Sequence, residues 1–314
     1  MPQQFVNLDA NETVFFAREL ESKKARAYDV VKAPLKAFDL FPVDTSAGAG
    51  AETIVYEQYD MTGLAKVIAN YADDLPRADV KGKEFTARIK SIGNSYGYSL
   101  QEIRASQMAN KSLPERKANA AVRSQREAWN RIAFYGDAVN NLQGFLTNIN
   151  IPDSSAPNGA GGTPQWSTKT PDEILADINT LANSVISLTN GAETPDTMVL
   201  PIDQYTLIAS TPRSSTSDTT ILEYFLQNNP FIKSVEWANE LDAAQLAANG
   251  VTRFTGDVAF VYRRSPDVVT LEMPVLFEQL PVQERGLEYI IPCHSRIGGV
   301  LVYYPLACAF LDSI

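Results

Sequence analysis

Two early segments of the chain alternate apolar with polar side chains. Residues 53–68 and 84–98 are rich in β-branched and aromatic residues, and within 84–98 the apolar positions alternate with charged or hydroxyl-bearing ones. The pattern predicts two strands. The charged stretch 69–83 between them is too long for a tight turn, so we expect a long projecting hairpin. An isolated two-stranded ribbon is only marginally stable in water, so this hairpin is expected to need a partner surface.

Capping boxes predict where helices begin. Ser99 with Glu102 predicts a short helix, and Ser112 with Glu115 predicts a long one from Leu113 to Tyr135, about 35 Å in length. Gly136 is expected to end the long helix. One face of this helix is apolar or small at three-four spacing: Ala118, Ala121, Val122, Ala128, Trp129, Ile132 and Ala133.

A third helix is predicted after the Gly/Ser/Pro-rich loop 152–165, which we interpret as a lobe boundary. Thr170 is its N-cap, Pro171 its first residue and Glu173 its capping glutamate, while Asn190 and Gly191 end it. Its core-facing residues are expected to be Ile174, Ile178, Leu181 and Val185.

The remaining pattern predicts shorter elements. A short helix is expected over residues 9–31 and an extended connector over 33–50. Beyond Asn190 we expect a strand at 198–200, helices at 202–210 and after Asp218, and then short strands. The C-terminal segment YIIPCHSRIGGVLVYYP predicts a hairpin or paired long strands.

Composition limits the possible classes of protein. With 314 residues, 45% of them hydrophobic, the chain can bury a sizeable core and is expected to form two lobes. No apolar run reaches the roughly 20 residues of a membrane helix, and the N-terminus lacks the pattern of a secretory signal, so cytoplasmic synthesis is expected. The formal net charge of -10 disfavours sequence-specific nucleic-acid binding.

The one histidine of the chain, His294, follows one of its two cysteines, Cys293. Neighbouring side chains of a strand point to opposite faces, so these two residues cannot form a nucleophile–base pair without a bulge. Cys308 could approach them, but no CxxC or HxxxH spacing supplies a zinc site. We predict that Cys293 is a buried apolar residue and His294 a polar surface or interface residue.

Other catalytic motifs are weak or missing. The sequence contains neither a GxxxxGK[ST] loop nor a GxSxG elbow, and the Gly-rich stretch SAGAGAE at residues 46–52 precedes a strand rather than a helix. Acidic residues are numerous, but no pattern brings two of them together, so helix capping and contact surfaces explain them better than catalysis. We expect no catalytic, cofactor-binding or metal-binding residues.

Four phrases of the sequence resemble a known family over almost the whole chain. They are NYADDLPRADVKGKEFTARIKSIGNSYGYSLQEIRAS, AFYGDAVNNLQGFLTN, IASTPRSSTSDTTILEYFLQNNPFIKSVEW and FEQLPVQERGLEYIIPCHSRIGGVLVYYP. In this order they resemble the major capsid (coat) protein of tailed bacteriophages, which has the α+β Hong Kong 97-type fold. The resemblance implies a structural protein and not an enzyme, self-assembling as pentamers and hexamers into an icosahedral head around double-stranded DNA.

The same resemblance implies a division of the chain into domains. It assigns residues 1–50 to an N-arm and 51–98 to an extended E-loop hairpin. Residues 99–169 would form a peripheral domain with the spine helix, 170–270 an axial domain, and 271–314 the C-terminal strands of the peripheral domain. Charge in the segments expected to meet neighbouring subunits marks a set of hypothesised contacts: Arg18, Glu19, Asp73, Asp74, Arg77, Asp79, Lys81, Lys83 and Arg213.

Partners and location follow from the resemblance as well. They are further copies of the chain, a portal protein, a scaffold and cementing or decoration proteins where present, and DNA held by enclosure, with no membrane. The location is the virion capsid, assembled in the bacterial host cytoplasm. Because the arm starts within a few residues of Met1, a separate scaffold or none is expected. No motif assigns cross-linking residues, although Lys81 and Lys83 lie near the hairpin tip.

Two other functions stay open at this point. One is an encapsulin-like nanocompartment shell with the same fold, which cargo would distinguish from a phage coat. The other is a cysteine or metal-dependent hydrolase that uses Cys293, His294 and nearby carboxylates; replacing Cys293 would abolish its activity but would leave a coat able to assemble.

Overall fold

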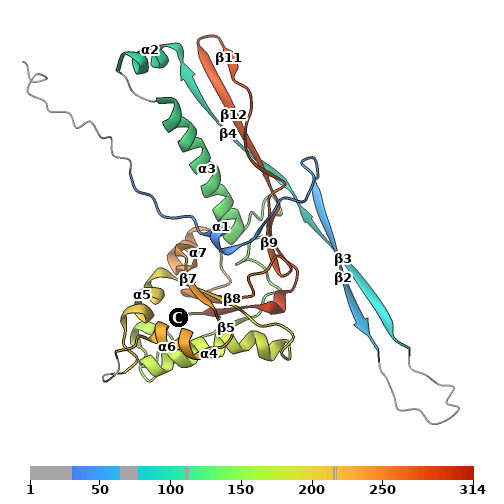
Figure 1. The fold of residues 1–314 in the computed structure, drawn as a ribbon, viewed down its shortest axis with the longest axis vertical. Coiled ribbons are helices and arrows are strands. Elements are labelled where there is room, and N and C mark those ends of the chain that lie inside the picture. The colour runs from blue at the N-terminus through green and yellow to red at the C-terminus, as the bar shows by residue number, and fades with distance from the viewer. Residues whose placement is uncertain (1–29, 64–76, 110–112, 215, 217) are drawn as a thin grey trace, which may run out of the picture. The chain divides into compact units, whose positions relative to one another are not determined.

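The computed structural model describes residues 30–63, 77–109, 113–214, 216 and 218–314. The chain falls into two compact units, residues 1–34 and 35–314. In the first unit the described residues 30–34 have no regular secondary structure, and the helix predicted over 9–31 lies almost wholly outside the described residues. The second unit contains every element described below (Figure 1).

A five-stranded mixed sheet forms one lobe of the second unit. Its strands, in spatial order, are β5 (Asp153–Ser155), β14 (Cys308–Asp312), β8 (Val258–Tyr262), β6 (Thr197–Leu200) and β7 (Ser234–Trp237). The central strands are buried on both faces, which explains the unbroken apolar run VAFVY in β8. Alternate residues of these strands therefore enter two different hydrophobic cores.

The core on one face contains helix α4 (Pro171–Leu188), which packs across β8 and β14. The predicted capping box is confirmed: Thr170 accepts from Glu173 N–H, and the Glu173 carboxylate accepts from Thr170 N–H. The four residues predicted to face the core are all buried. Helices α5 (Ile202–Ser210), α6 (Ile221–Asn228) and α7 (Ala243–Ala248) complete this lobe.

The long helix α3 (Leu113–Tyr135) has the predicted ends and packs against a long antiparallel strand pair. This pair is β4 (Lys90–Ser99) and β12 (Glu288–Ile297), joined in ten residue pairs and flanked by β10 (Val275–Gln279) and β11 (Gln283–Arg285). Deep in the contact, Trp129 Nε1 donates to Ser295 Oγ at 3.0 Å. Helix α2 (Leu100–Ala109) follows β4, and the Ser99–Glu102 capping box that begins it is confirmed.

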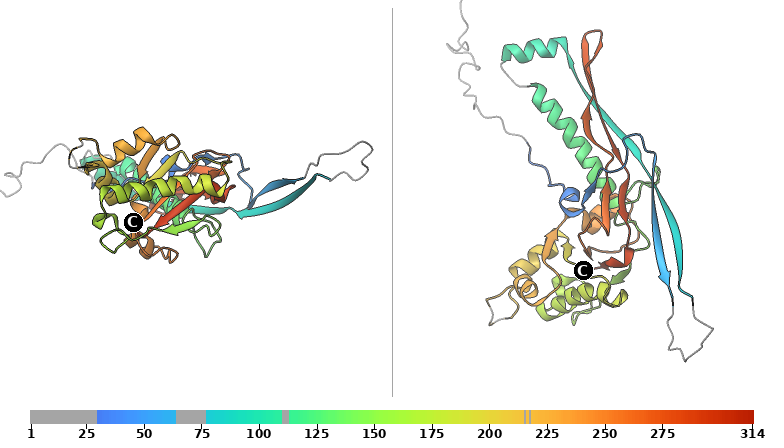
Figure 2. Two further views of the ribbon diagram at one scale, coloured as in Figure 1. Left: turned by 90° about the horizontal axis from the view of Figure 1, so that it is seen from below. Right: turned by 45° about the vertical axis from the view of Figure 1, so that its right-hand side comes forward.

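The projecting hairpin consists of β2 (Thr53–Thr62) and β3 (Asp79–Arg88), antiparallel in ten residue pairs. Both Figure 1 and Figure 2 show it extending away from the two sheets. The prediction of one strand over 84–98 is wrong. β3 begins earlier and ends at Arg88, and the following strand, β4, pairs with β12 instead of β2. The reason is Ile89, whose side chain is buried and whose N–H donates to Glu52 O at 2.9 Å.

The connector predicted over 33–50 contains one short helix, α1 (Ala37–Leu40), so the prediction of extended chain is only partly correct. Asn130 Oδ1 of α3 accepts from Ala37 N–H at 2.9 Å and fixes this turn. After it, β1 (Val43–Asp44) pairs in parallel with β9 (Val269–Glu272).

The C-terminal strands also differ from one predicted alternative. β12 and β13 (Gly299–Val302) do not form a hairpin, because β13 pairs with β9 while β12 pairs with β4. Gly299 allows the change of direction: its φ is +81°, and a Cβ there would lie 2.4 Å from Gln143 O. The last strand, β14, does not continue beside α3 but lies in the five-stranded sheet.

Candidate assembly surfaces

One face of the hairpin exposes a row of apolar side chains. Val55, Tyr59 and Met61 of β2 and Val80 of β3 share this face because they stand at alternate ladder positions. Their exposure is large, 60% for Tyr59 and 82% for Met61. Tyr59 lies against Gly82, where an added Cβ would come within 2.9 Å of its ring. Such an apolar row on a two-stranded ribbon is typical of a surface that docks on a partner.

The charged hypothesised contacts of β3, Asp79, Lys81 and Lys83, lie on the face of the hairpin opposite this row, and Arg77 precedes the strand. Arg77, Asp79, Lys81 and Lys83 are all exposed, and none makes an ion pair with another described residue. Lys83 Nζ stands 4.7 Å from the centre of the Phe85 ring, and Asp79 accepts from Val80 N–H at 2.8 Å. Within the described residues, the charges of Arg77 and Lys81 therefore have no ion-pair partner.

The hairpin is attached to the body through aromatic rings. Tyr56 stacks on Phe85 with ring centres 5.1 Å apart and meets Tyr303 edge-on at 4.9 Å. Tyr303 donates to Glu272 at 3.2 Å, and Thr270 donates to the same carboxylate oxygen at 2.7 Å. Burial raises the pKa of Glu272 and raises the pKa of Tyr303 to about 12. This polar cluster fixes the ring on which the hairpin rests.

Arg213 makes contacts within its own chain. Its guanidinium lies 3.8 Å from the centre of the Tyr224 ring, and its Nε is 3.9 Å from an Asp172 carboxylate oxygen. Arg213 N–H donates to Thr219 O, which holds its end of the loop before α6. An intersubunit role for Arg213 stays a prediction, as do those of Arg77, Asp79, Lys81 and Lys83.

The other hypothesised contacts, Arg18, Glu19, Asp73 and Asp74, lie outside the described residues.

The structure does not bring Cys293 and His294 together. Cys293 is 2% exposed and belongs to a small cluster with Tyr98, Ala121 and Ile291 beneath α3. His294, the next residue of β12, lies on the opposite, half-buried face. Burial raises the pKa of both Cys293 and Cys308, which keeps them as thiols. Among the described residues, no group of three or more His, Cys, Asp or Glu side chains could hold a metal ion.

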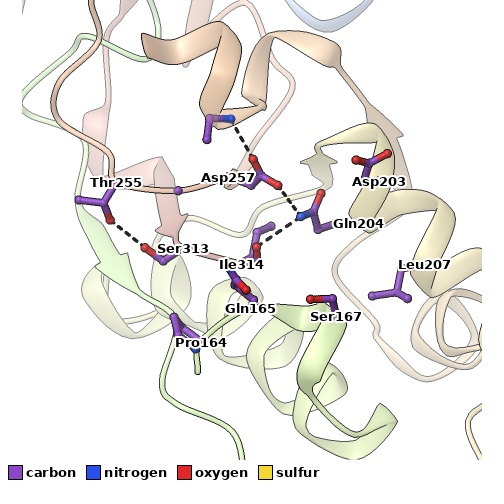
Figure 3. A pocket seen from close by; sticks show the side chains of 12 residues that line it. Pro164, Gln165, Ser167, Asp203, Gln204, Leu207, Thr255, Asp257, Ser313 and Ile314 are labelled. Atoms are coloured by element: carbon purple, nitrogen blue, oxygen red, sulfur yellow. Dashed lines mark hydrogen bonds between the residues drawn. The ribbon is translucent and has the colours of Figure 1, made fainter. Parts of the chain in front are cut away.

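A cavity of about 650 Å³ between α5 and the C-terminal residues has polar walls but no catalytic set (Figure 3). Asp257 accepts from Ala243 N–H at 2.8 Å and from Gln204 Nε2 at 2.6 Å. Figure 3 shows Gln204 between Asp257 and Ile314, whose carbonyl oxygen it also reaches. Asp257 therefore orients the Gln204 side chain, which in turn binds the last residue, Ile314.

Sequence reasoning missed a second exposed apolar group, on the loop and turn around β11. Leu280, Val282 and Leu287 are 41%, 57% and 70% exposed. The apolar residues were visible in the segment FEQLPVQERGLEY, and their position on either side of QER, just before Gly286, was the available signal. The pattern alone does not show that these side chains lack a covering element.

In the part of the chain that the structure describes, no helix is both long and apolar enough to cross a membrane.

Comparisons with known proteins identify the class to which this fold belongs. A model of the family described as major capsid protein matches residues 63–314. The capsid of Myoviridae phage XM1 matches with a TM-score of 0.81 at 16% identity, over 96% of this chain and 99% of that one. The capsid of a native GTA particle matches with a TM-score of 0.60 at 11% identity, over 93% and 94% of the two chains.

A virus-like particle from Pyrococcus furiosus also matches, with a TM-score of 0.51 at 12% identity, over 87% and 91% of the two chains. A comparison with curated protein sequences gives no match. The structural similarities show an α+β fold of the Hong Kong 97 type. The chain belongs to the major capsid protein family, and its role is structural rather than enzymatic.

Proposed function

We propose that this capsid protein assembles as pentamers and hexamers into an icosahedral phage head that encloses double-stranded DNA. The observation that carries the proposal is the hairpin β2–β3, a ribbon with little core of its own. It exposes an apolar row and charges that have no ion-pair partner among the described residues. A neighbouring subunit that covers this ribbon would bury the row and stabilise both partners.

We propose the domain roles on the same basis. Residues 1–50 are an N-arm, and within 51–98 the projecting part of the E-loop is β2–β3. Residues 99–169 and 271–314 build the peripheral domain around α3 and the long strand pair, although β14 lies in the sheet of the other lobe. Residues 170–270 are the axial domain, which meets its copies around five- and six-fold axes.

Enclosure of DNA fits the charge of the chain. A formal charge of -10 makes a wall that does not adsorb a polyanion, so DNA can be packed in and released without being bound by sequence. Further partners under this proposal are a portal protein, a scaffold and cementing proteins, with assembly in the host cytoplasm.

A nanocompartment shell is the second candidate, because the virus-like particle from Pyrococcus furiosus shares the fold. Nuclease-protected DNA in purified particles supports the phage head, whereas protein cargo without DNA supports the compartment.

The test is reversal of the exposed charge of Arg77. The Arg77→Glu variant should give several-fold fewer particles by negative-stain microscopy, while its subunit unfolds within about 1 °C of the wild-type temperature, because surface changes of this kind barely alter stability. Arg77→Lys keeps the charge and should assemble normally. Wild-type yields from Arg77→Glu would argue against a contact at Arg77, and a wild-type chain that never assembles would overturn the proposal.

A further inference from the structure

A recess with three cationic side chains lies where the hairpin joins the body. It has a volume of about 540 Å³, and its lining residues are Glu52, Thr53, Arg88, Ile89, Lys90, Ser91 and Arg296. Three cations and one carboxylate give the lining a formal charge of about +2 at neutral pH. In a chain with a net charge of -10, such a local positive recess needs an explanation.

The strand pairing places these cations at a junction of two ladders. Thr53 opposite Arg88 is the last pair of the hairpin, and Ile297 opposite Lys90 is the first pair of β4 with β12. Arg296 stands opposite Ser91, one pair further into the second ladder. The chain passes there from one sheet to the other, so residues of β3, β4 and β12 line one recess, with Arg296 and Lys90 on opposite faces of the second ladder.

No carboxylate of the described residues neutralises this recess. Arg88, Lys90 and Arg296 make no ion pair with a described residue, and Glu52, the one acid in the lining, is not within ion-pair distance of them. Arg296 donates through Nη1 to Ala49 O, while its Nε is buried without an acceptor. A buried donor without a partner is costly, so a small shift of the Arg296 side chain toward an incoming carboxylate would be favourable.

The recess is also accessible. Arg296 lies on the face of β12 opposite the buried residues Ser295 and Ile297, which face α3. On the same face of β4, Ser91, Gly93 and Ser95 are exposed. Ala49 covers part of this side at Arg296, whereas the small, exposed side chains of β4 let another backbone approach closely.

We propose that this recess binds a carboxylate side chain of a second copy of the chain, inserted between Arg88, Lys90 and Arg296. The proposal rests on the proposed function, because it names the chemistry of one contact in the shell. A second copy carries 37 acidic against 27 basic side chains and so presents an excess of suitable ligands. Arginine forms paired hydrogen bonds to carboxylates, and both Arg88 and Arg296 line the recess.

A DNA phosphate is the less favoured ligand. Duplex binding requires a basic surface that follows many phosphates, whereas this recess holds three cations in one hollow of an acidic chain. The carboxylate of a neighbouring subunit needs one such hollow only, and the recess lies at the base of the hairpin that would reach between subunits.

The experiment uses zero-length carbodiimide cross-linking of assembled particles, which joins a lysine amine to a carboxylate that touches it. Particles are grown from a mixture of ¹⁴N- and ¹⁵N-labelled chains, so that a link between copies gives peptide pairs of mixed label. We expect Lys90 to be linked to an aspartate or glutamate in mixed-label pairs. Lys90→Arg, which keeps the charge, should assemble normally and lose this link.

A second measurement tests the contribution to assembly. The Lys90→Gln/Arg296→Gln variant should yield about tenfold fewer particles, the effect of losing one charge-assisted contact per subunit. Wild-type particles in which Lys90 forms no mixed-label link, or is linked only to Glu52 of the same copy, would overturn the inference while leaving the proposed function intact. Absence of particles from the wild-type chain would instead overturn both.

Discussion

At the scale of residues, strand geometry separates groups that are neighbours in the sequence. Cys293 faces a small apolar cluster beneath α3, and His294 faces the other side of β12. The pattern of the sequence was sufficient to predict both positions, because alternation along a strand is a property of the backbone. It could not predict that Glu272 is buried, since that depends on the distant Tyr303 and Thr270.

Replacement of Cys293 tests the structural interpretation of this thiol. The Cys293→Ala variant should assemble into particles in wild-type yield, at a cost of about 1 kcal/mol in the free energy of unfolding, since it removes one buried sulfur atom. Particle yield and chemical denaturation measure the two effects. His294→Ala, on the opposite face, should leave stability within about 0.5 kcal/mol of the wild type. Failure of Cys293→Ala particles to form, with the fold intact, would contradict this interpretation.

Glu272 should make stability depend on pH. Burial raises its pKa in the folded chain above the ordinary value of 4.5, so the folded state holds the proton more tightly than the unfolded state. The resulting stabilisation is fully present below pH 4.5 and is lost as the pH rises through the folded pKa. Asp44, which faces Glu272, acts in the same direction because its negative charge raises that pKa further.

The Glu272→Gln variant cannot ionise and should lose this dependence. Its unfolding temperature relative to the wild type is expected to rise between pH 4.5 and pH 7, by about 2 °C in total. Differential scanning calorimetry across this range is the measurement. A constant difference at all pH values would show that Glu272 does not titrate between the two states.

At the scale of elements, capping chemistry was predicted more reliably than pairing. The boxes at Ser99 and Thr170 and both ends of α3 follow from local residues and are confirmed. The break at Ile89 was missed, although the apolar positions change there from odd to even numbers, where the strand changes its partner from β2 to β12. Pairing over long distances depends on which surface is free, which periodicity within one segment does not contain.

The contact of α3 with β12 should depend on one buried hydrogen bond. Trp129→Phe removes the donor to Ser295 and should lower the free energy of unfolding by about 2 kcal/mol, through lost packing and an unsatisfied hydroxyl. The Trp129→Phe/Ser295→Ala double variant should cost less than the sum of the single variants. Denaturant titration of the four chains gives the coupling energy, and strict additivity would show that the bond contributes nothing.

At the scale of the whole molecule, the stability of the subunit and its capacity to assemble are located in different places. The cores lie around the sheets and helices, whereas the exposed apolar row Val55, Tyr59, Met61 and Val80 contributes little to them. The sequence predicted that a hairpin would project, because a long charged segment between two strands cannot be buried. It did not predict which face would be apolar, since that depends on the register of β2 with β3.

A charge placed on this row should separate the two properties. Met61→Glu is expected to reduce particle yield at least fivefold, because a carboxylate would have to be desolvated in the contact. The unfolding temperature of the free subunit should change by less than about 1 °C. Met61→Leu, which stays apolar, is the matched control and should assemble normally. Equal particle yields from the glutamate and leucine variants would place the contact elsewhere.

The five-stranded sheet has a mechanical consequence that follows from its two buried faces. Val258, Phe260 and Tyr262 enter one core, while Ala259 and Val261 enter the other. Because single strands contribute to both cores, neither lobe can loosen without disturbing the packing of its neighbour. A force applied to the hairpin by a neighbouring subunit would therefore be resisted by both cores of the subunit together. A thin capsid wall could then bear load without a separate reinforcing protein.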